Sequence, residues 1–338
     1  MSQEHFIIIG NGPSGYAAAL TLREILPEER ITIISRERQP AYFPRFLPDL
    51  IAGKMDEEQI FASGFSSYKE NKIKLRSGQQ VVDLDLGRRE LILDHKERLA
   101  FDGLIIAVGG KPRIPEPYLN FRDFMLTLKT LEDTKAWILA LKQTENILIV
   151  GGDLTSFAVV KALCSLGKKV YFMFDESAFW PLRSNHRLLK EAEDSLNRKG
   201  VEVLAGKTIK GIAQRDNLTY EIGINGGKLE VGLVGAFFGL VPDVRFLARS
   251  GLTLDRGILV DEYLRVGIPG IYATGDCAQI YHPEINDYWV SIGHQNAVNL
   301  GRIAAINLSG GMLQADVARE SIYDVDGIRV NTSWWLEY

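Results

Sequence analysis

The feature that most constrains this chain is residues 6–15, FIIIGNGPSG, where an apolar β-branched run stops at a glycine and a helix-forming segment, YAAAL, follows. Gly10, Gly12 and Gly15 have the G-x-G-x-x-G spacing of dinucleotide-binding turns. In such turns the first glycine permits the tight bend, the second lets the backbone approach a pyrophosphate, and the third allows close strand–helix packing. The helix N-terminus adds amide donors and a positive dipole end. The stretch predicts a dinucleotide site; the alternative is a glycine-rich turn of an unrelated α/β protein.

The size and charge of the chain narrow the classes of partner. With 338 residues it is long enough for two domains, and its net charge of −4 comes without a Lys/Arg-rich block. This argues against nucleic acid or an anionic membrane as the main partner and leaves a small or protein redox partner. The chain passes from Met1 into a strand without a signal-peptide pattern, and no apolar run approaches membrane-spanning length. We therefore expect a cytoplasmic protein.

The cysteines and the other reactive side chains suggest no chemistry of their own. Cys164 and Cys277 stand too far apart for a C-x-x-C pair or a metal cage. The chain has no evident Ser/His/Asp constellation and no metal-spaced ligands, and His294 is better explained as a helix residue than as a base. We expect no catalytic residue and no metal site, so any redox chemistry must come from a bound cofactor.

Two segments after the first helix are candidates for cofactor contact. Residues 30–35 read as a second parallel strand, and Ser35 stands where an acid usually binds a ribose hydroxyl. Ser35 can still hydrogen-bond a hydroxyl and Arg36 can stack on an adenine; the alternative is a solvated turn. Residues 39–54, QPAYFPRFLPDLIAGK, are too apolar for a plain linker. They either cover a flat cofactor or form a proline-shaped packing loop. The residues likeliest to contact that cofactor are Tyr42, Pro44, Arg45 and Pro48.

The remaining pattern alternates strands and helices, as in an α/β protein with parallel sheets. A proline-rich stretch at residues 112–117 marks the first domain boundary, and residues 239–243 look like the return crossing. Strands are expected at residues 72–75, 80–84, 90–93, 99–110, 147–150, 169–174, 201–204 and 270–274, with further alternating strands up to residue 238, and helices at residues 56–71, 131–142, 185–199 and 291–308.

A second glycine turn begins at Gly151, but Asp153 and Ser156 stand where the second and third glycines belong. An aspartate there adds bulk and a negative charge against an incoming anion. The next strand ends at Phe174, followed by Asp175 and Glu176. If a nucleotide binds here, those carboxylates favour NADH over NADPH. The pattern retains the fold signal and leaves nucleotide binding open.

An aspartate near the end of the chain also stands at a candidate site. Asp276 follows the short strand at residues 270–274, at the strand end where α/β sheets bind ligands, although it could instead cap a helix. The tail at residues 311–338 carries Trp334, Trp335 and Tyr338, which favour packing or an interface over cofactor contact.

Taken together, the initial G-x-G-x-x-G, the A-V-G-G before the proline-rich crossing, the G-G-D turn and the late Y-A-T-G-D resemble the FAD-dependent pyridine nucleotide-disulfide oxidoreductase family. The match covers about residues 4–310, and YFPRFLPDLIAGK and YWVSIGHQNAVNLG are most similar to the rubredoxin-reductase and nitrite-reductase-flavoprotein branch. The resemblance implies an α/β fold with two Rossmann-like, doubly wound three-layer domains. Residues 1–112 and 246–338 would form a split FAD domain around an inserted NAD(P)-binding-like domain at residues 113–245.

The resemblance also implies which residues contact FAD. Those at the pyrophosphate and the adenosine would be Gly10, Gly12, Pro13, Ser14, Gly15, Ser35, Arg36 and Val82. Those toward the flavin and its ribityl–phosphate portion would be Ala107, Val108, Gly109, Arg113, Gly275, Asp276 and the turn at residues 292–295, which includes Gln295.

The chain departs from the family pattern in three ways. It has no redox cysteine pair near the first helix, Ala158 stands where a glutamate usually faces the nicotinamide, and a short tail stands where the family has a dimerisation domain of roughly 100 residues. We therefore expect either a flavoprotein that passes electrons from NADH to rubredoxin, ferredoxin or an iron–sulfur subunit, or a FAD-carrying subunit of a larger redox complex without a working NAD site. The tail could dock another subunit.

Overall fold

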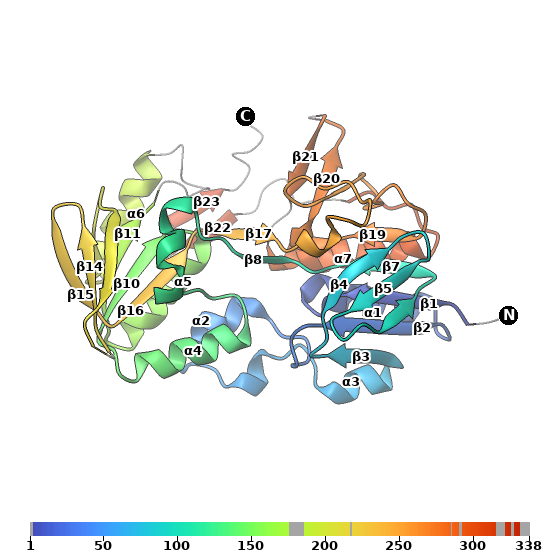
Figure 1. Cartoon of the computed structure of the whole chain (residues 1–338), viewed down its shortest axis with the longest axis horizontal. Helices are drawn as coiled ribbons and strands as arrows, with labels where there is room; N and C mark the ends of the chain where they lie inside the picture. The colour runs from blue at the N-terminus through green and yellow to red at the C-terminus, as the bar shows by residue number, and fades with distance from the viewer. Residues whose placement is uncertain are drawn as a thin grey trace. The chain divides into compact units, whose positions relative to one another are not determined.

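The computed structural model describes residues 3–175, 186–216, 218–284, 286–290, 293–315, 322–325 and 328–331. The chain divides into two compact units. The first unit comprises Met1–Phe43, Phe61–Lys111 and Val241–Ala318, and the second comprises Pro44–Ile60, Pro112–Leu240 and Arg319–Tyr338. Each unit contains a parallel sheet of five strands (Figure 1).

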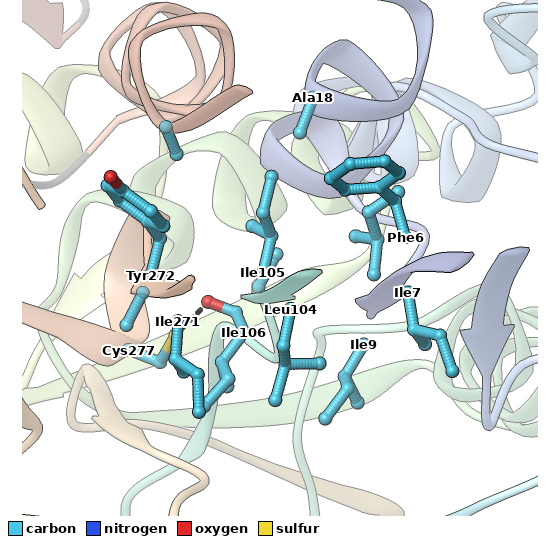
Figure 2. Packing of buried hydrophobic residues seen from close by; sticks show 14 of the residues in the cluster. Phe6, Ile7, Ile9, Ala18, Leu104, Ile105, Ile106, Ile271, Tyr272 and Cys277 are labelled. Atoms are coloured by element: carbon cyan, nitrogen blue, oxygen red, sulfur yellow. Dashed lines mark hydrogen bonds between the residues drawn. The ribbon is translucent and has the colours of Figure 1, made fainter. Parts of the chain in front are cut away.

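The sheet of the first unit has the strand order β19-β7-β1-β2-β3. Its strands are β1 (His5–Ile9), β2 (Arg30–Ser35), β3 (Ile73–Ser77), β7 (Gly103–Ile106) and β19 (Ile271–Ala273), and all of their pairings are parallel. The central strands are buried along their length, which is why they read as continuous Ile/Leu runs. Figure 2 shows Phe6 and Ile105 on the side of the sheet that faces Ala18 of α1 (Pro13–Ile25), and Ile9, Leu104 and Ile106 on the opposite side.

Smaller elements complete the first unit. They are α3 (Phe65–Glu70), η5 (Arg245–Leu247), η6 (Gly275–Cys277), α7 (His294–Leu308), and two three-stranded sheets, one of β4 (Val81–Asp85), β5 (Glu90–Leu93) and β6 (Arg98–Ala100), the other of β18 (Ile258–Val260), β20 (Ala278–His282) and β21 (Asp287–Val290).

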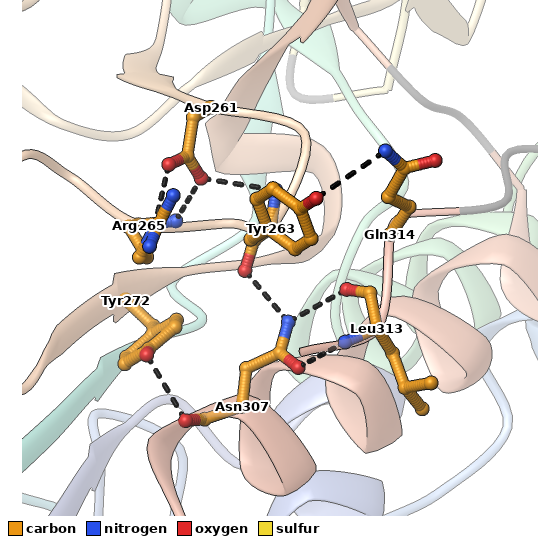
Figure 3. A network of polar contacts seen from close by, with 7 residues as sticks. All are labelled: Asp261, Tyr263, Arg265, Tyr272, Asn307, Leu313 and Gln314. Carbon is orange, nitrogen blue, oxygen red and sulfur yellow. Dashed lines mark hydrogen bonds and ion pairs between the residues drawn. The ribbon is translucent and has the colours of Figure 1, made fainter. Parts of the chain in front are cut away.

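The buried Asn307 anchors the chain where it leaves α7 (Figure 3). Its Nδ2 donates to the backbone oxygens of Tyr263 at 2.9 Å and Leu313 at 2.8 Å, and its Oδ1 accepts from the Leu313 N–H at 2.7 Å. One amide thus satisfies three backbone groups, as a buried polar side chain should.

The sheet of the second unit has the order β12-β11-β10-β16-β9 and is also parallel. Its strands are β9 (Met125–Leu126), β10 (Asn146–Gly151), β11 (Lys169–Phe174), β12 (Glu202–Val203) and β16 (Leu233–Phe237). Its other elements are η1 (Pro44–Phe46), α2 (Leu47–Ile51), η2 (Glu57–Ile60), η3 (Glu116–Phe124), α4 (Leu131–Leu141), α5 (Leu154–Ser165), α6 (His186–Arg198), the antiparallel sheet of β13 (Ile209–Gln214), β14 (Tyr220–Ile224) and β15 (Gly227–Val231), and the hairpin of β22 (Ile322–Val325) and β23 (Ile328–Asn331). Where the chain passes between the units, β8 (Gly110–Pro112) pairs with β17 (Leu240–Pro242).

Most of the predicted elements are confirmed, and three boundaries were wrong. The helix expected at residues 56–71 is broken into η2 and α3, because Phe61 bridges to Tyr42 and a new helix begins after Gly64. The strand expected at residues 99–110 is divided into β6 and β7, because the Asp102 N–H turns to the His5 carbonyl at 2.8 Å. The helix expected at residues 291–308 begins at His294 after Gly293, and residues 291–292 lie outside the described residues.

Candidate functional site

The first glycine turn joins β1 to α1, and two of its three glycines are required by packing within the chain. A Cβ on Gly10 would lie 2.2 Å from the Ala107 carbonyl oxygen, and a Cβ on Gly15 would lie 2.0 Å from the Gly10 carbonyl oxygen. Real Cβ atoms do not approach a backbone oxygen so closely, so only glycine fits these positions.

Gly12 is different, because a Cβ there would meet nothing within 4 Å. It is the N-cap residue of α1, it is exposed, and no side chain caps the helix. The first amides of an α-helix have no partner within the helix and attract anions. The turn thus leaves open space beside a helix N-terminus, which fits a pyrophosphate approaching the backbone.

Ser14, a predicted pyrophosphate contact, is buried in the first turn of α1. Its Oγ lies 3.0 Å from the Thr274 Oγ1, and a Cβ on Gly301 of α7 would lie 2.1 Å from the Ser14 carbonyl oxygen. The hydroxyl and the close helix–helix contact brace the N-terminus of α1, so at least one function of Ser14 is structural.

The carboxyl ends of the strands in the first unit bring most of the predicted residues to one edge of its sheet. Adjacent parallel strands end there, and ligands of open α/β sheets bind at that edge. The residues that end or follow these strands are Gly10 and Gly12 after β1, Ser35 and Arg36 at β2, Ala107, Val108 and Gly109 after β7, and Gly275 and Asp276 after β19.

Asp276 lies in η6 and is partly buried. The N-cap of η6 is Thr274 and that of α7 is Gly293, and neither helix has a side-chain cap. Asp276 is therefore not the N-cap residue of either helix.

Other predicted contacts lie elsewhere. Arg45 in η1 and Arg113, next to β8, belong to the second unit. Val82 lies on β4 at a register shift and is 39% exposed, and Gln295 is exposed in the first turn of α7. Within the first unit, the loop before η1 does reach the start of α7, since the Phe43 and His294 rings lie 5.4 Å apart.

Sequence reasoning missed Asp243, which joins the strand ends of β2 and β7. Its carboxylate accepts from the Lys111 Nζ at 2.8 Å and the Arg36 Nη1 at 3.4 Å, and its N–H donates to the Gly109 carbonyl at 3.1 Å. Burial alone would raise the pKa of Asp243, but the Lys111 and Arg36 cations outweigh burial and hold that pKa below its usual range. No local signal could reveal a pair as far apart in sequence as Arg36 and Asp243.

A buried tyrosine, also missed, fixes the residue between the first two glycines. The Tyr68 hydroxyl donates to the Asn11 Oδ1 at 3.0 Å and accepts from the Ala41 N–H at 2.8 Å. Desolvation raises the pKa of Tyr68, so it stays a neutral donor. The turn is therefore held rigid by side chains from outside the motif.

The second glycine turn joins β10 to α5 with the same backbone requirement at its first glycine. A Cβ on Gly151 would lie 2.0 Å from the Phe237 carbonyl oxygen. At the next motif position, Asp153 caps α5: its Oδ1 accepts from the Ser156 N–H at 2.9 Å, and its Oδ2 accepts from the Gly239 N–H at 3.0 Å. Burial raises the pKa of Asp153, and it outweighs the hydrogen bonds from the Ser156 and Gly239 N–H groups, which lower that pKa. Ala158 is exposed on α5.

The acid after β11 is also engaged. The Asp175 Oδ2 accepts from the Tyr118 hydroxyl at 2.6 Å, and the Asp175 N–H donates to the Gly151 carbonyl at 2.8 Å. Burial, and then the Asp175 carboxylate, raise the pKa of Tyr118. Glu176 lies outside the described residues.

The surroundings of the Cys277 thiol make it unreactive. Cys277 is buried, its Sγ donates to the Thr274 carbonyl at 3.2 Å, and burial raises its pKa to about 11. A thiol so protonated is a poor nucleophile. Among the described residues, no three His, Cys, Asp or Glu side chains are grouped to hold a metal ion. Nor does any helix in that part of the chain have the length and apolarity to cross a membrane.

Residues 4–313 match the family model described as pyridine nucleotide-disulphide oxidoreductase. The chain belongs to this family. The family is FAD-dependent and uses NAD(P)H. At the level of the family, this confirms the expected NAD(P)H-dependent flavin oxidoreductase and its Rossmann-like α/β fold.

Named relatives agree with the branch that the sequence indicated. The chain is 27% identical over 281 residues to nitrite reductase [NAD(P)H] of Bacillus subtilis, covering 82% of this chain but only 35% of that protein. It is 28% identical over 334 residues to putidaredoxin reductase CamA of Pseudomonas putida, covering 94% and 77% of the two chains. The crystal structure of the covalent putidaredoxin reductase–putidaredoxin complex has the same fold, with a TM-score of 0.86, 24% identity, and coverage of 96% and 80%.

Proposed function

We propose that this chain is a FAD-dependent oxidoreductase that transfers electrons between NADH and a protein redox acceptor such as a rubredoxin, a ferredoxin or an iron–sulfur subunit. The observation that carries the proposal is the open N-terminus of α1 at Gly12, in a turn whose other two glycines are required by packing. A glycine that the fold does not need is explained by a ligand that needs the space.

In this proposal FAD binds at the strand ends of the first unit. Gly10, Gly12, Pro13, Ser14 and Gly15 form the pyrophosphate turn, and the family resemblance assigns Ser35, Arg36 and Val82 to the adenosine and Ala107, Val108, Gly109, Gly275, Asp276 and Gln295 to the flavin and its ribityl chain. The bound flavin supplies hydride acceptance and single-electron release. The protein supplies binding and orientation. The N-terminal amides of α1 would bind the negatively charged pyrophosphate, and the ion pairs of Asp243 with Lys111 and Arg36 fix the ends of β2 and β7.

The proposed domain assignment is the one that the family resemblance implies. Residues 1–112 and 246–338 would bind FAD, and residues 113–245 would bind the nicotinamide nucleotide. The Asp175 carboxylate favours NADH, because it accepts a hydrogen bond from a 2′-hydroxyl and repels a 2′-phosphate.

The acceptor is proposed to be a redox protein because a relative covering 94% of this chain is named for putidaredoxin. Docking of a partner through the tail at residues 311–338 is part of the proposal, although most of that tail lies outside the described residues. We also propose that the protein acts in the cytoplasm.

A second candidate is a FAD-carrying electron-transfer subunit that receives no electrons from NADH. The bonded Asp153 carboxylate at the N-terminus of α5 favours it, because that position in the first unit is an open glycine.

The test is anaerobic mixing of the FAD-loaded protein with NADH while the flavin absorbance is recorded. Rapid bleaching, followed by reoxidation when a rubredoxin or a ferredoxin is added, supports the first candidate. Reduction by dithionite but not by NADH or NADPH rejects it for this chain and supports the second. The Asp276→Ala variant is expected to lose FAD content, and a wild-type flavin content would remove Asp276 from the proposed site.

A further inference from the structure

The two glycine turns provide an internal comparison of one scaffold with and without a helix-capping side chain. In each, a parallel strand runs into a glycine pressed against the carbonyl of a neighbouring strand end, Ala107 for Gly10 and Phe237 for Gly151. The N-cap of each helix is the residue two positions later, Gly12 for α1 and Asp153 for α5. The difference lies at that residue: space beside Gly12, and a carboxylate at Asp153.

The Asp153 carboxylate uses the groups that would otherwise receive a phosphate. It accepts from Ser156 N–H in the first turn of α5, and it also accepts from Gly239 N–H, beyond the end of β16. β10 and β16 are neighbours in the sheet, and α5 leads from β10 to β11 on the other side. The ends of β10 and β16 therefore flank the topological switch point, where a dinucleotide pyrophosphate binds in this architecture. Asp153 bridges that point.

The Tyr118 hydroxyl likewise uses a group that would otherwise bind the ligand, here the acid at the ribose position. In a dinucleotide site the acid after the second strand accepts a hydrogen bond from the ribose 2′-hydroxyl. Here the acid is Asp175, and its donor is the hydroxyl of Tyr118 at 2.6 Å. Tyr118 is buried and packs against Phe238, with ring centroids 4.8 Å apart, so its hydroxyl is held in place by packing.

We infer that Asp153 and Tyr118 occupy, from within the chain, the positions of a nucleotide's pyrophosphate and ribose hydroxyl, and that these two residues set the affinity of the second unit for NADH. The inference rests on the proposed function and deepens it. A dinucleotide then binds weakly, because its pyrophosphate must displace a carboxylate that already has its hydrogen bonds and repels it while charged.

The two substitutions predict separable effects on different parts of the ligand. Asp153→Gly gives α5 an open N-cap like that of α1, so ligands with a pyrophosphate should bind more tightly. Tyr118→Phe keeps the ring packing but removes the hydroxyl that donates to the Asp175 carboxylate, so ligands with a ribose should bind more tightly whether or not they carry phosphate.

The experiment is a calorimetric titration of the FAD-loaded proteins with ADP-ribose and with adenosine. ADP-ribose has the pyrophosphate and ribose but cannot reduce the flavin, so the measurement does not depend on electron transfer. We expect Asp153→Gly to lower the Kd of ADP-ribose at least about tenfold, the effect of gaining one charge-assisted hydrogen bond, and to leave adenosine unchanged. Tyr118→Phe should lower both Kd values, by about three- to tenfold.

Asp153→Asn removes the charge while keeping an acceptor for the Ser156 N–H, and it should fall between the wild type and Asp153→Gly. It also tests the inference if the glycine variant does not fold. The matched control is Asp133→Asn, because the Asp133 carboxylate supports the N-terminus of α4 by accepting from the Lys129 and Thr130 N–H groups. It should leave both Kd values unchanged.

Unchanged or weaker ADP-ribose binding in both Asp153 variants would overturn the assignment of Asp153, and unchanged adenosine binding in Tyr118→Phe would overturn that of Tyr118. A tightening equal in the Asp133→Asn control would show a general effect of helix ends and would also overturn the inference. Failure of NADH to bleach the wild-type flavin rejects the first proposed function alone, because ADP-ribose binding is measured separately.

Discussion

The two single variants Gly12→Ala and Gly10→Ala are expected to have different effects, the first on flavin binding and the second on folding. Both glycines belong to one motif, but their surroundings differ. A Cβ on Gly10 would lie 2.2 Å from the Ala107 carbonyl oxygen, at a φ of +109°, whereas a Cβ on Gly12 would meet nothing within 4 Å, at a φ of −74°. Gly10→Ala should therefore destabilise the protein without ligand, and Gly12→Ala should weaken FAD binding.

The magnitudes follow from these contacts. For Gly10→Ala, a strained φ costs about 1–3 kcal/mol and overpacking costs about as much, so the loss is about 2–6 kcal/mol. That is a large part of the roughly 5–15 kcal/mol by which domains are stable. For Gly12→Ala, a poorer N-cap costs about 1 kcal/mol, and a stiffer unfolded chain returns about 0.4–1 kcal/mol, so the stability of the apoprotein should hardly change.

The loss of FAD affinity in Gly12→Ala has a different origin. A methyl group in the space beside the N-terminus of α1 would hold the pyrophosphate away from the amides. Losing one hydrogen bond to a charged group costs about 1.5–3 kcal/mol, which corresponds to a Kd increase of about 10- to 150-fold.

Two measurements check this pair of variants: thermal unfolding of the apoproteins by circular dichroism, and FAD titration followed by quenching of flavin fluorescence. We expect Gly10→Ala to lower the apoprotein Tm by about 3–8 °C, while Gly12→Ala keeps the Tm and loses FAD affinity. The reasoning is refuted if Gly12→Ala binds FAD as the wild type does, or if it loses as much apoprotein stability as Gly10→Ala.

Two further predictions concern stability. Asn307→Ala leaves three backbone groups without their partner and should cost about 2–5 kcal/mol in urea unfolding; a cost below about 1 kcal/mol would contradict a role in anchoring the chain after α7. The Asp94 and then the Glu97 carboxylate raise the pKa of His95 above its ordinary 6.5. Because the pKa of His95 is raised in the folded state, the stability that its charge contributes is complete below pH 6.5. That stability is lost as the pH rises through the folded pKa. His95→Gln should therefore lower the urea midpoint at about pH 5.5 and not at about pH 9, and a difference that does not vary with pH would contradict the assignment.

The parallel sheets could be predicted from the sequence because their signals are local. Residues 30–35 and 169–174 are β-branched or aromatic runs next to turn residues, and both are strands with those bounds. The broken elements could not be predicted, because distant contacts decide them. The division between β6 and β7 depends on Asp102 pairing with the His5 carbonyl, and nothing in the intervening sequence marks it.

The candidate site divides in a similar way. Gly10 and Gly15 carry a backbone requirement that the motif states directly, and the structure has the corresponding close contacts. Asp243 and Tyr68 act on the same strand ends from far along the chain, so no spacing rule could find them. The residue-by-residue assignment of FAD contacts stays a prediction, as do the domain boundaries.

The two turns also separate what the fold requires from what a ligand requires. Gly10 and Gly151 are each closed in by a backbone oxygen, at 2.2 Å and 2.0 Å from a hypothetical Cβ, so both turns need glycine in order to form. The position two residues later has no such requirement: Gly12 faces open space, and in the second turn each Asp153 carboxylate oxygen accepts a hydrogen bond. A carboxylate at that position leaves the strand, turn and helix intact and changes only what the helix N-terminus can hold. We therefore infer that Asp153 lowers the affinity of the second unit for a nucleotide. The Asp153→Gly titration measures by how much.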